Sequence, residues 1–161
     1  MHEPRARPRR GHRSHQRGDG PVTPEQPEQA QTWTLHQYPE TLAVVRLGPG
    51  SEVPSWAESS SVFSVTATAY ETSVVCAGRD VPAKAKAIRG LTAFAVEGPL
   101  DPSLVGVLAG LLTALAEESI SVFTLSTFDT DWVLVPGADA ERAADAWRRR
   151  GHVVEPAPVA G

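Results

Sequence analysis

The fold is decided by residues 91–135, which have the sequence LTAFAVEGPLDPSLVGVLAGLLTALAEESISVFTLSTFDTDWVLV. Residues 91–96 are typical of a strand, and Gly98-Pro99 ends it. Asp101-Pro102-Ser103 is a good helix start, because Asp101 can accept a hydrogen bond from a free backbone N–H and proline suits the first helical position. The elements expected next are a helix to about Glu118, a central strand at Ile120–Leu125 and, after a tight turn, a strand at Trp132–Val135.

The expected helix is apolar on nearly all of its surface. One broad face carries larger side chains: Leu104, Val107, Leu108, Leu111, Leu112 and Leu115. The other side carries smaller residues: Val105, Gly106, Ala109, Gly110 and Ala114. A helix of this kind is usually buried on two sides. We therefore expect one side to pack on its own sheet and the other to meet a second layer or a second subunit.

A second helix follows the last strand of this stretch. Asp139 is expected to cap a helix over Ala140–Arg150, Gly151 suits a left-handed helix end, and residues 152–154 form a short last strand. The order from Leu91 to Val154 is therefore βαββαβ. Two crossovers place both helices on one face of an antiparallel four-stranded sheet, which is a ferredoxin-like α+β fold.

The first half, Trp33 to Ala87, has strand-like segments at similar spacing with only short helical turns between them. We interpret it as a degenerate copy of the same unit. The predicted organisation is a basic, Pro-rich disordered tail at residues 1–31, a degenerate unit at 32–88, a complete unit at 89–155 and a tail at 156–161.

Charge is unevenly distributed along the 161 residues. Residues 1–20 hold six of the fifteen Lys and Arg residues, although the whole chain has a net charge of −4, so the remainder is acidic. Nucleic acid is therefore an unlikely partner of the body. The basic tail is open to three interpretations: contact with phosphate or an acidic partner, a disordered extension, or a mis-assigned start. No apolar run is long enough to span a membrane and no secretory signal is present, so we expect a cytoplasmic location.

Catalytic machinery is not indicated. The body has two histidines, His36 and His152, both on expected terminal strands. It has no Ser-His-Asp order, metal-ligand spacing or phosphate-binding glycine loop. We expect no enzymatic activity, no cofactor and no metal.

Three segments resemble a known family: Ser61–Thr66 (SVFSVT), Val96–Leu100 (VEGPL) and Ile120–Asp131 (ISVFTLSTFDTD). With the βαββαβ order, they resemble the ACT domain, a ferredoxin-like module that senses small molecules, most often amino acids. The resemblance is closest to small bacterial ACT-domain proteins related to the CASTOR arginine sensors. It covers about residues 33–155 and implies two ACT units in tandem.

The resemblance also implies a ligand site at a boundary between ACT units. The matching positions are Glu97, Gly98, Thr127, Phe128 and Asp131, with Ser64 and Val65 on the N-terminal unit. Such a site suits an amino acid, because its carboxylate prefers N–H groups at a helix N-terminus and its ammonium prefers a carboxylate. Plain structural interpretations remain for each residue: Glu97 as a solvated strand end, Thr127 and Phe128 as the end of a strand, and Asp131 as a turn residue.

The function expected on this basis is regulation by a bound small molecule, an amino acid above all, held between ACT units. Its partners would be that ligand and either a second copy of the chain or a regulated protein. The alternative is a module that binds no ligand and serves only to form a homo-oligomer or to dock a protein. The sensor function predicts an open polar pocket in the region from Glu97 to Asp131, and the assembly module predicts that side chains fill it.

Overall fold

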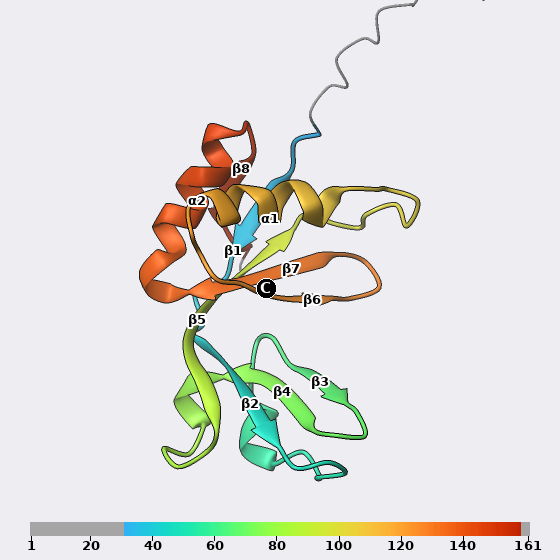
Figure 1. The fold of residues 1–161 in the computed structure, drawn as a ribbon, viewed down its shortest axis with the longest axis vertical. Coiled ribbons are helices and arrows are strands. Elements are labelled where there is room, and N and C mark those ends of the chain that lie inside the picture. The colour runs from blue at the N-terminus through green and yellow to red at the C-terminus, as the bar shows by residue number, and fades with distance from the viewer. Residues whose placement is uncertain (1–30, 159–161) are drawn as a thin grey trace, which may run out of the picture. The chain divides into compact units, whose positions relative to one another are not determined.

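The structure is a computed structural model, and it describes residues 31–158. The expected tail at residues 1–31 lies outside the described residues except for Gln31, and so do residues 159–161. The described part of the chain has the predicted α+β class. Its elements are β1 (Thr34–Gln37), β2 (Leu42–Leu47), β3 (Ser64–Ala67), β4 (Thr72–Ala77), β5 (Ala87–Val96), α1 (Val107–Glu117), β6 (Phe123–Ser126), β7 (Asp131–Pro136), α2 (Ala140–Arg149) and β8 (Val153–Pro156) (Figure 1).

Strand β5 is shared by two halves of one sheet (Figure 1). Its first half pairs antiparallel with β2, where Ala87 lies opposite Val45. Its second half pairs antiparallel with β1 on that same edge and with β7 on the other, where Phe94 lies opposite Val133. The N-terminal half of the sheet therefore has the order β3-β4-β2-β5, and the C-terminal half has the order β6-β7-β5-β1-β8.

Strand β1 pairs within the C-terminal half, whereas the sequence pattern placed a strand here in the N-terminal unit. It lies between β5 and β8, antiparallel to the first and parallel to the second. Leu35 on β1 is fully buried in the core below the helices. Packing and backbone pairing on both sides therefore hold β1 in place. The boundary between the predicted units 32–88 and 89–155 falls within β5, and this division remains a prediction.

Strand β6 lies at an edge of the sheet, so the prediction of a central strand at Ile120–Leu125 was wrong. Among residues 31–158 it pairs with β7 alone, and Phe123 is 37% exposed. Ile120 and Val122, whose apolar side chains favoured a central strand, precede β6 and pack against the core below the helices. A run of apolar residues that packs against the core before a strand has the same sequence pattern as a buried strand.

Helices α1 and α2 cover one face of the C-terminal half, as predicted (Figure 1). Trp147 of α2 is fully buried between them. Its indole N–H donates a hydrogen bond to the Leu111 carbonyl of α1 at 3.0 Å, and its ring meets Phe94 of β5 edge-on with centroids 4.9 Å apart. One side chain therefore joins both helices to the sheet.

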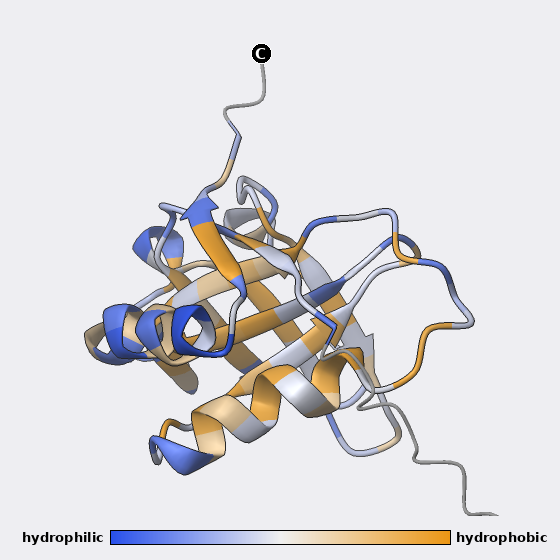
Figure 2. Cartoon of the chain, turned by 90° about the horizontal axis from the view of Figure 1, so that it is seen from above, coloured by the Kyte–Doolittle hydropathy of each residue, from blue (hydrophilic) through white to orange (hydrophobic). Residues whose placement is uncertain are grey.

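Helix α1 begins at Val107 instead of near Ser103. Gly106 has φ +79°, a left-handed conformation that interrupts helix geometry and favours glycine. Ala109 and Gly110 on the small-residue side of α1 are exposed in the single chain, whereas Ala114, which was predicted on the same side, is buried. Figure 2 shows that α1 is apolar along most of its length, whereas α2 is largely hydrophilic.

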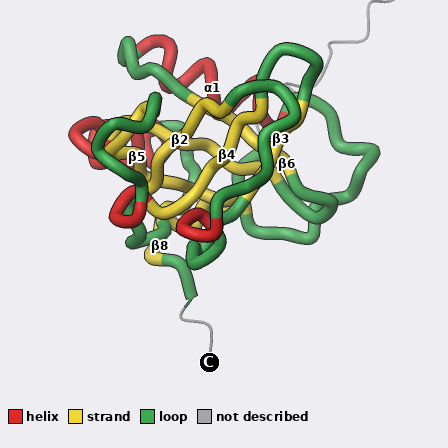
Figure 3. Tube along the Cα trace, turned by 90° about the horizontal axis from the view of Figure 1, so that it is seen from below, coloured by secondary structure: helices red, strands yellow, loops and turns green. Residues whose placement is uncertain are grey.

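The opposite face of β5 and β7 packs against the N-terminal half. Leu134 and Ala93 point away from the helices and form a second core with Leu42. A third core lies within the N-terminal half, where Cys76 is fully buried among apolar side chains. Figure 3 shows this half from below, with β2 and β4 running side by side.

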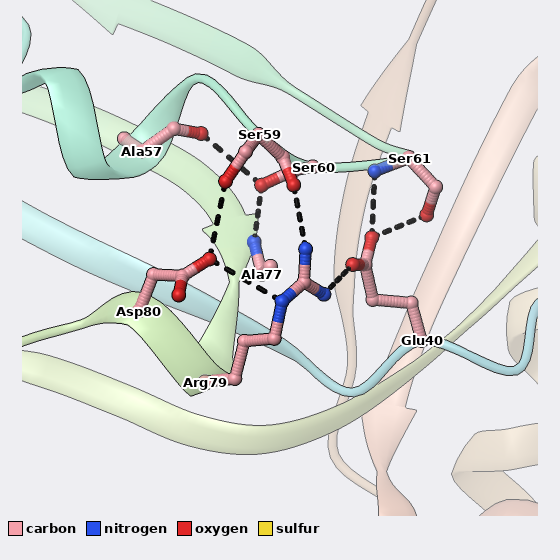
Figure 4. Close-up of polar contacts among 8 residues, drawn as sticks. All are labelled: Glu40, Ala57, Ser59, Ser60, Ser61, Ala77, Arg79 and Asp80. Atoms are coloured by element: carbon pink, nitrogen blue, oxygen red, sulfur yellow. Dashed lines mark hydrogen bonds and ion pairs between the residues drawn. The ribbon is translucent and has the colours of Figure 1, made fainter.

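A polar cluster holds the loops of the N-terminal half together (Figure 4). The Glu40 carboxylate accepts hydrogen bonds from the Ser61 N–H at 2.6 Å and from the Ser61 hydroxyl, and it forms an ion pair with Arg79. Arg79 also donates to the Ser59 carbonyl at 2.7 Å. Burial would raise the pKa of Glu40, but the hydrogen bonds from Ser61 and Arg79 outweigh it and hold that pKa below its usual value.

Candidate functional site

The segment between β5 and α1 lies against the turn between β6 and β7. The Leu100 N–H donates a hydrogen bond to the Asp129 carbonyl at 2.8 Å, and the Thr130 hydroxyl donates to the Val96 carbonyl. Gly98 completes the contact, because a Cβ atom there would lie 3.0 Å from the Asp129 carbonyl oxygen. A Cβ contact this short is tighter than most that proteins show, so glycine at position 98 favours the close approach of the turn to the end of β5.

A pocket of about 330 Å³ opens between this segment and this turn. Its lining comes from two parts of the chain: Leu100, Asp101, Pro102, Leu104, Gly106, Val107 and Leu108 on one side, and residues 127–131 on the other. Phe128 stands at the tip of the turn and is 96% exposed. The region that the sequence singled out is therefore an open pocket and is not filled by side chains.

Three carboxylates line the pocket, and no Lys, Arg or His does. Asp131 Oδ1 accepts a hydrogen bond from the Ser126 hydroxyl at 2.6 Å. Asp101 accepts hydrogen bonds from the Ser103 N–H at 2.8 Å and from its hydroxyl at 2.7 Å, and these bonds lower the pKa of Asp101. The prediction that Asp101 caps the helix was wrong: α1 begins at Val107 with no side-chain cap, and Asp101 closes only the local turn at Ser103. The pocket carries an excess of negative charge.

The N-terminus of α1 supplies hydrogen-bond donors at the same pocket. Gly106, Val107 and Leu108 line it, and no side chain caps the helix. The first intrahelical bond runs from the Gly110 N–H to the Gly106 carbonyl. Backbone N–H groups before Gly110 therefore lack an intrahelical acceptor, and the helix dipole favours an anion beside them.

The seven predicted site residues divide into two groups. Thr127, Phe128 and Asp131 line the pocket, and Gly98 contacts its turn. Glu97 does not line it: its carboxylate lies 3.7 Å from His36 Nε2. Ser64 and Val65 are on β3, where Ser64 lines a separate hollow and Val65 is exposed.

Sequence reasoning did not identify the apolar part of this pocket. Leu100, Leu104 and Leu108 line it, but they also pack partly against the helix-side core. Their pattern is that of core residues, so no signal in a single sequence separates the two roles. Thr130 was also missed, since a turn threonine gives no indication that its hydroxyl binds a strand end.

Within residues 31–158, no group of three or more His, Cys, Asp or Glu side chains is arranged to hold a metal ion. Over the same range, no helix has the length and apolar character needed to cross a membrane.

Solved structures share this fold. A protein from Agobacterium tumefaciens is 27% identical with a TM-score of 0.75, over 82% of this chain and 98% of that one. A Vibrio cholerae protein, described as of unknown function and a possible transport protein, is 16% identical with a TM-score of 0.60, over 73% of this chain and 89% of that one. Aspartate kinase from Clostridium acetobutylicum, described as an allosteric enzyme, is 15% identical with a TM-score of 0.57, over 71% of this chain. The match covers 33% of that kinase, and the last two likenesses concern the fold alone.

Family models match two segments of the chain. A model described as an N-terminal domain matches residues 40–84, and the model of the ACT domain matches residues 86–149. No curated protein matches the chain. The ACT match includes β5, both helices and the turn that carries Asp131. Residues 86–149 of the chain therefore match the ACT domain, and this match covers less than half of the 161 residues.

Proposed function

We propose that this protein is a sensor that binds an amino acid in the pocket between the Leu100–Leu108 segment and the β6–β7 turn. ACT domains typically bind amino acids and oligomerise, and the pocket lies within the matched domain. The observation that carries the proposal is the lining itself. It combines backbone donors at the start of α1 with the carboxylates of Asp129 and Asp131.

The two ends of an amino acid match these two sets of groups. The α-carboxylate would accept hydrogen bonds from the free N–H groups of α1, where the helix dipole favours negative charge. The α-ammonium would bind Asp131, because hydrogen bonds between charged partners are the stronger ones. Leu104 and Leu108 offer apolar contact to an aliphatic side chain.

The charge of the pocket favours a basic amino acid. With three carboxylates and no cation in the lining, the carboxylates of Asp101 and Asp129 remain for a cationic side chain after the α-ammonium is paired with Asp131. The resemblance to CASTOR-related proteins supports the same choice, and arginine is the first ligand to test. Phe128, which is almost fully exposed, would cover the aliphatic part of such a ligand.

A second ACT unit would complete the site. The pocket is open, and α1 exposes Ala109 and Gly110 beside it. We propose that another copy of the chain packs on this side, so that the ligand is held between ACT units and biases how they pack. A ligand that favours one packing shifts the population toward it, which would expose or hide a surface for a regulated protein.

A thermal-shift screen of the full chain against the twenty amino acids and common nucleotides tests the proposal. A ligand that binds only the folded state raises the melting temperature by mass action. We expect a selective, concentration-dependent rise for one amino acid or a small group, with arginine among them. A flat panel at millimolar ligand would exclude the sensor function.

The second candidate is an assembly module that binds no ligand. It is favoured by the exposed small residues Ala109 and Gly110 of α1, which would allow two helices to approach closely. This alternative predicts a dimer whose mass in light scattering does not change with any amino acid. A dimer that forms or dissociates when arginine is added would contradict it.

A further inference from the structure

A second hollow lies between the two halves of the chain, away from the amino-acid pocket. Its outer part has a volume of about 600 Å³, and an inner part of about 120 Å³ shares Val44, Thr66, Ser73 and Phe123 with it. Strands β3 and β6 stand on opposite walls of the inner part, and they lie near each other in Figures 1 and 3. We call the combined space the inter-sheet cleft.

The inter-sheet cleft exposes apolar side chains. Ile88 of β5 is 50% exposed and Phe123 of β6 is 37% exposed, and both line it together with Val44 of β2. Apolar surface that is removed from water contributes about 25 cal/mol per Å². A ligand with an apolar body would therefore be stabilised by covering these side chains.

The rim of the cleft is positively charged, although the body of the chain is acidic. Six of the nine Lys and Arg side chains in residues 31–158 form ion pairs with carboxylates. The three that form none with any described carboxylate, Lys84, Lys86 and Arg89, fall within six consecutive residues. Lys86 lines the cleft beside Arg46, whose Nε lies 2.9 Å from Glu71 Oε2. Two cations and one carboxylate therefore line the outer part, and Lys86 is the unbalanced charge.

Hydroxyl groups complete the lining. Thr66 and Ser73 lie opposite each other in the β3–β4 pair, and both line the cleft. Neither hydroxyl forms a hydrogen bond with another described residue. Two donors therefore lie in the same space as the Lys86 ammonium, where an anionic group would satisfy them.

We propose that the inter-sheet cleft binds a small carboxylate with an apolar aliphatic or aromatic body. Lys86 pairs with the carboxylate at the rim, and the body covers Ile88 and Phe123. This site is separate from the amino-acid pocket in position and opposite to it in charge: aspartates line that pocket, and an unpaired lysine lines this cleft.

Octanoate is the probe that tests this site in the full chain, by isothermal titration. Octylammonium, which has the same chain length and the opposite charge, is its control. We expect saturable octanoate binding, with octylammonium weaker by at least about tenfold, because a paired charge is worth about one such factor. Lys86→Met should weaken the affinity for octanoate by about tenfold. Lys84→Met removes a charge outside the lining and should leave that affinity unchanged. Ile88→Asp places a carboxylate at an exposed wall position and should abolish binding.

Three results would overturn the proposal. One is the absence of saturable octanoate binding, and another is equal affinity for octanoate and octylammonium. The third is an unchanged affinity in Lys86→Met. Asp131→Asn separates this proposal from the sensor function: octanoate should bind that variant normally, and its loss there would place octanoate in the amino-acid pocket. A flat amino-acid screen would leave the octanoate result unaffected.

Discussion

The Ser126 hydroxyl donates a hydrogen bond to Asp131 Oδ1 at 2.6 Å, across the turn that joins β6 to β7. Asp131 also lines the pocket, so its carboxylate is placed to meet a ligand there. We expect Asp131→Ala and Asp131→Asn to weaken amino-acid binding at least about tenfold, because each removes a charged partner of the ammonium. Asp131→Ala should lower stability by about 1 kcal/mol, the worth of one hydrogen bond, whereas Asp131→Asn keeps an acceptor for the Ser126 hydroxyl.

Asp145→Asn is the matched control, since Asp145 pairs with Arg148 on α2 and does not line the pocket. Affinity from titration calorimetry and the free energy of unfolding from urea denaturation separate the two effects. An Asp131→Asn variant with unchanged affinity would remove Asp131 from the site.

Gly98→Ala should loosen the pocket without touching a ligand. Its Cβ would meet the Asp129 carbonyl oxygen at 3.0 Å and Thr130 Cβ at 3.2 Å, so the turn must move. We expect weaker amino-acid binding and a lower melting temperature. Gly48→Ala is the control, because the nearest atom to a Cβ there is the Ser51 hydroxyl oxygen at 3.4 Å and Gly48 lies outside both the pocket and α1. Equal affinity in Gly98→Ala and wild type would show that the turn does not shape the pocket.

Local patterns in the sequence predicted most of the elements. The strand-like segments expected between Trp33 and Ala87 include the two strands of the β3–β4 hairpin, where Ser64 lies opposite Val75. The left-handed Gly151 at the end of α2 was predicted in the same way, and its φ is +89°. Insertion of β1 between β5 and β8 was not predictable, because a four-residue strand does not specify a partner more than fifty residues away.

The site was predictable only in part. Thr127, Phe128 and Asp131 were singled out through the family resemblance, and the structure brings them to one pocket. The helix start at Val107 depends on the conformation of Gly106, which composition cannot reveal. The inter-sheet cleft was not foreseen, because Ile88 and Phe123 have the pattern of buried strand residues.

Glu40 should stabilise the N-terminal half through charge as well as through hydrogen bonding. Glu40→Ala removes the acceptor of the Ser61 N–H, the Ser61 hydroxyl and Arg79, and it should lower the free energy of unfolding by about 1–3 kcal/mol. Because the folded-state pKa of Glu40 lies below its unfolded value, its contribution is present above that unfolded value and is lost as pH falls through the folded pKa. Urea denaturation of wild type and Glu40→Ala at pH 7 and pH 4 measures the stability that Glu40 contributes at each pH. A difference between wild type and Glu40→Ala that does not shrink at pH 4 would contradict the charged role.

His152 should make the chain less stable in mild acid. Its Nδ1 accepts a hydrogen bond from the Trp33 N–H at 3.0 Å, which requires that nitrogen to be unprotonated. Burial, and then the charge of Arg150, lower the pKa of His152. The unfolded chain therefore binds the proton first, at about pH 6.5. Stability from His152 is complete above that pH and is lost as pH falls toward the folded-state pKa, with a slope of at most about 1.4 kcal/mol per pH unit.

His152→Asn keeps an acceptor near Nδ1 but does not titrate, so its free energy of unfolding should fall less between pH 7 and pH 5. If the free energy of unfolding falls equally with pH in wild type and in His152→Asn, His152 is not the group that titrates. His36 is present in both proteins and does not affect the comparison.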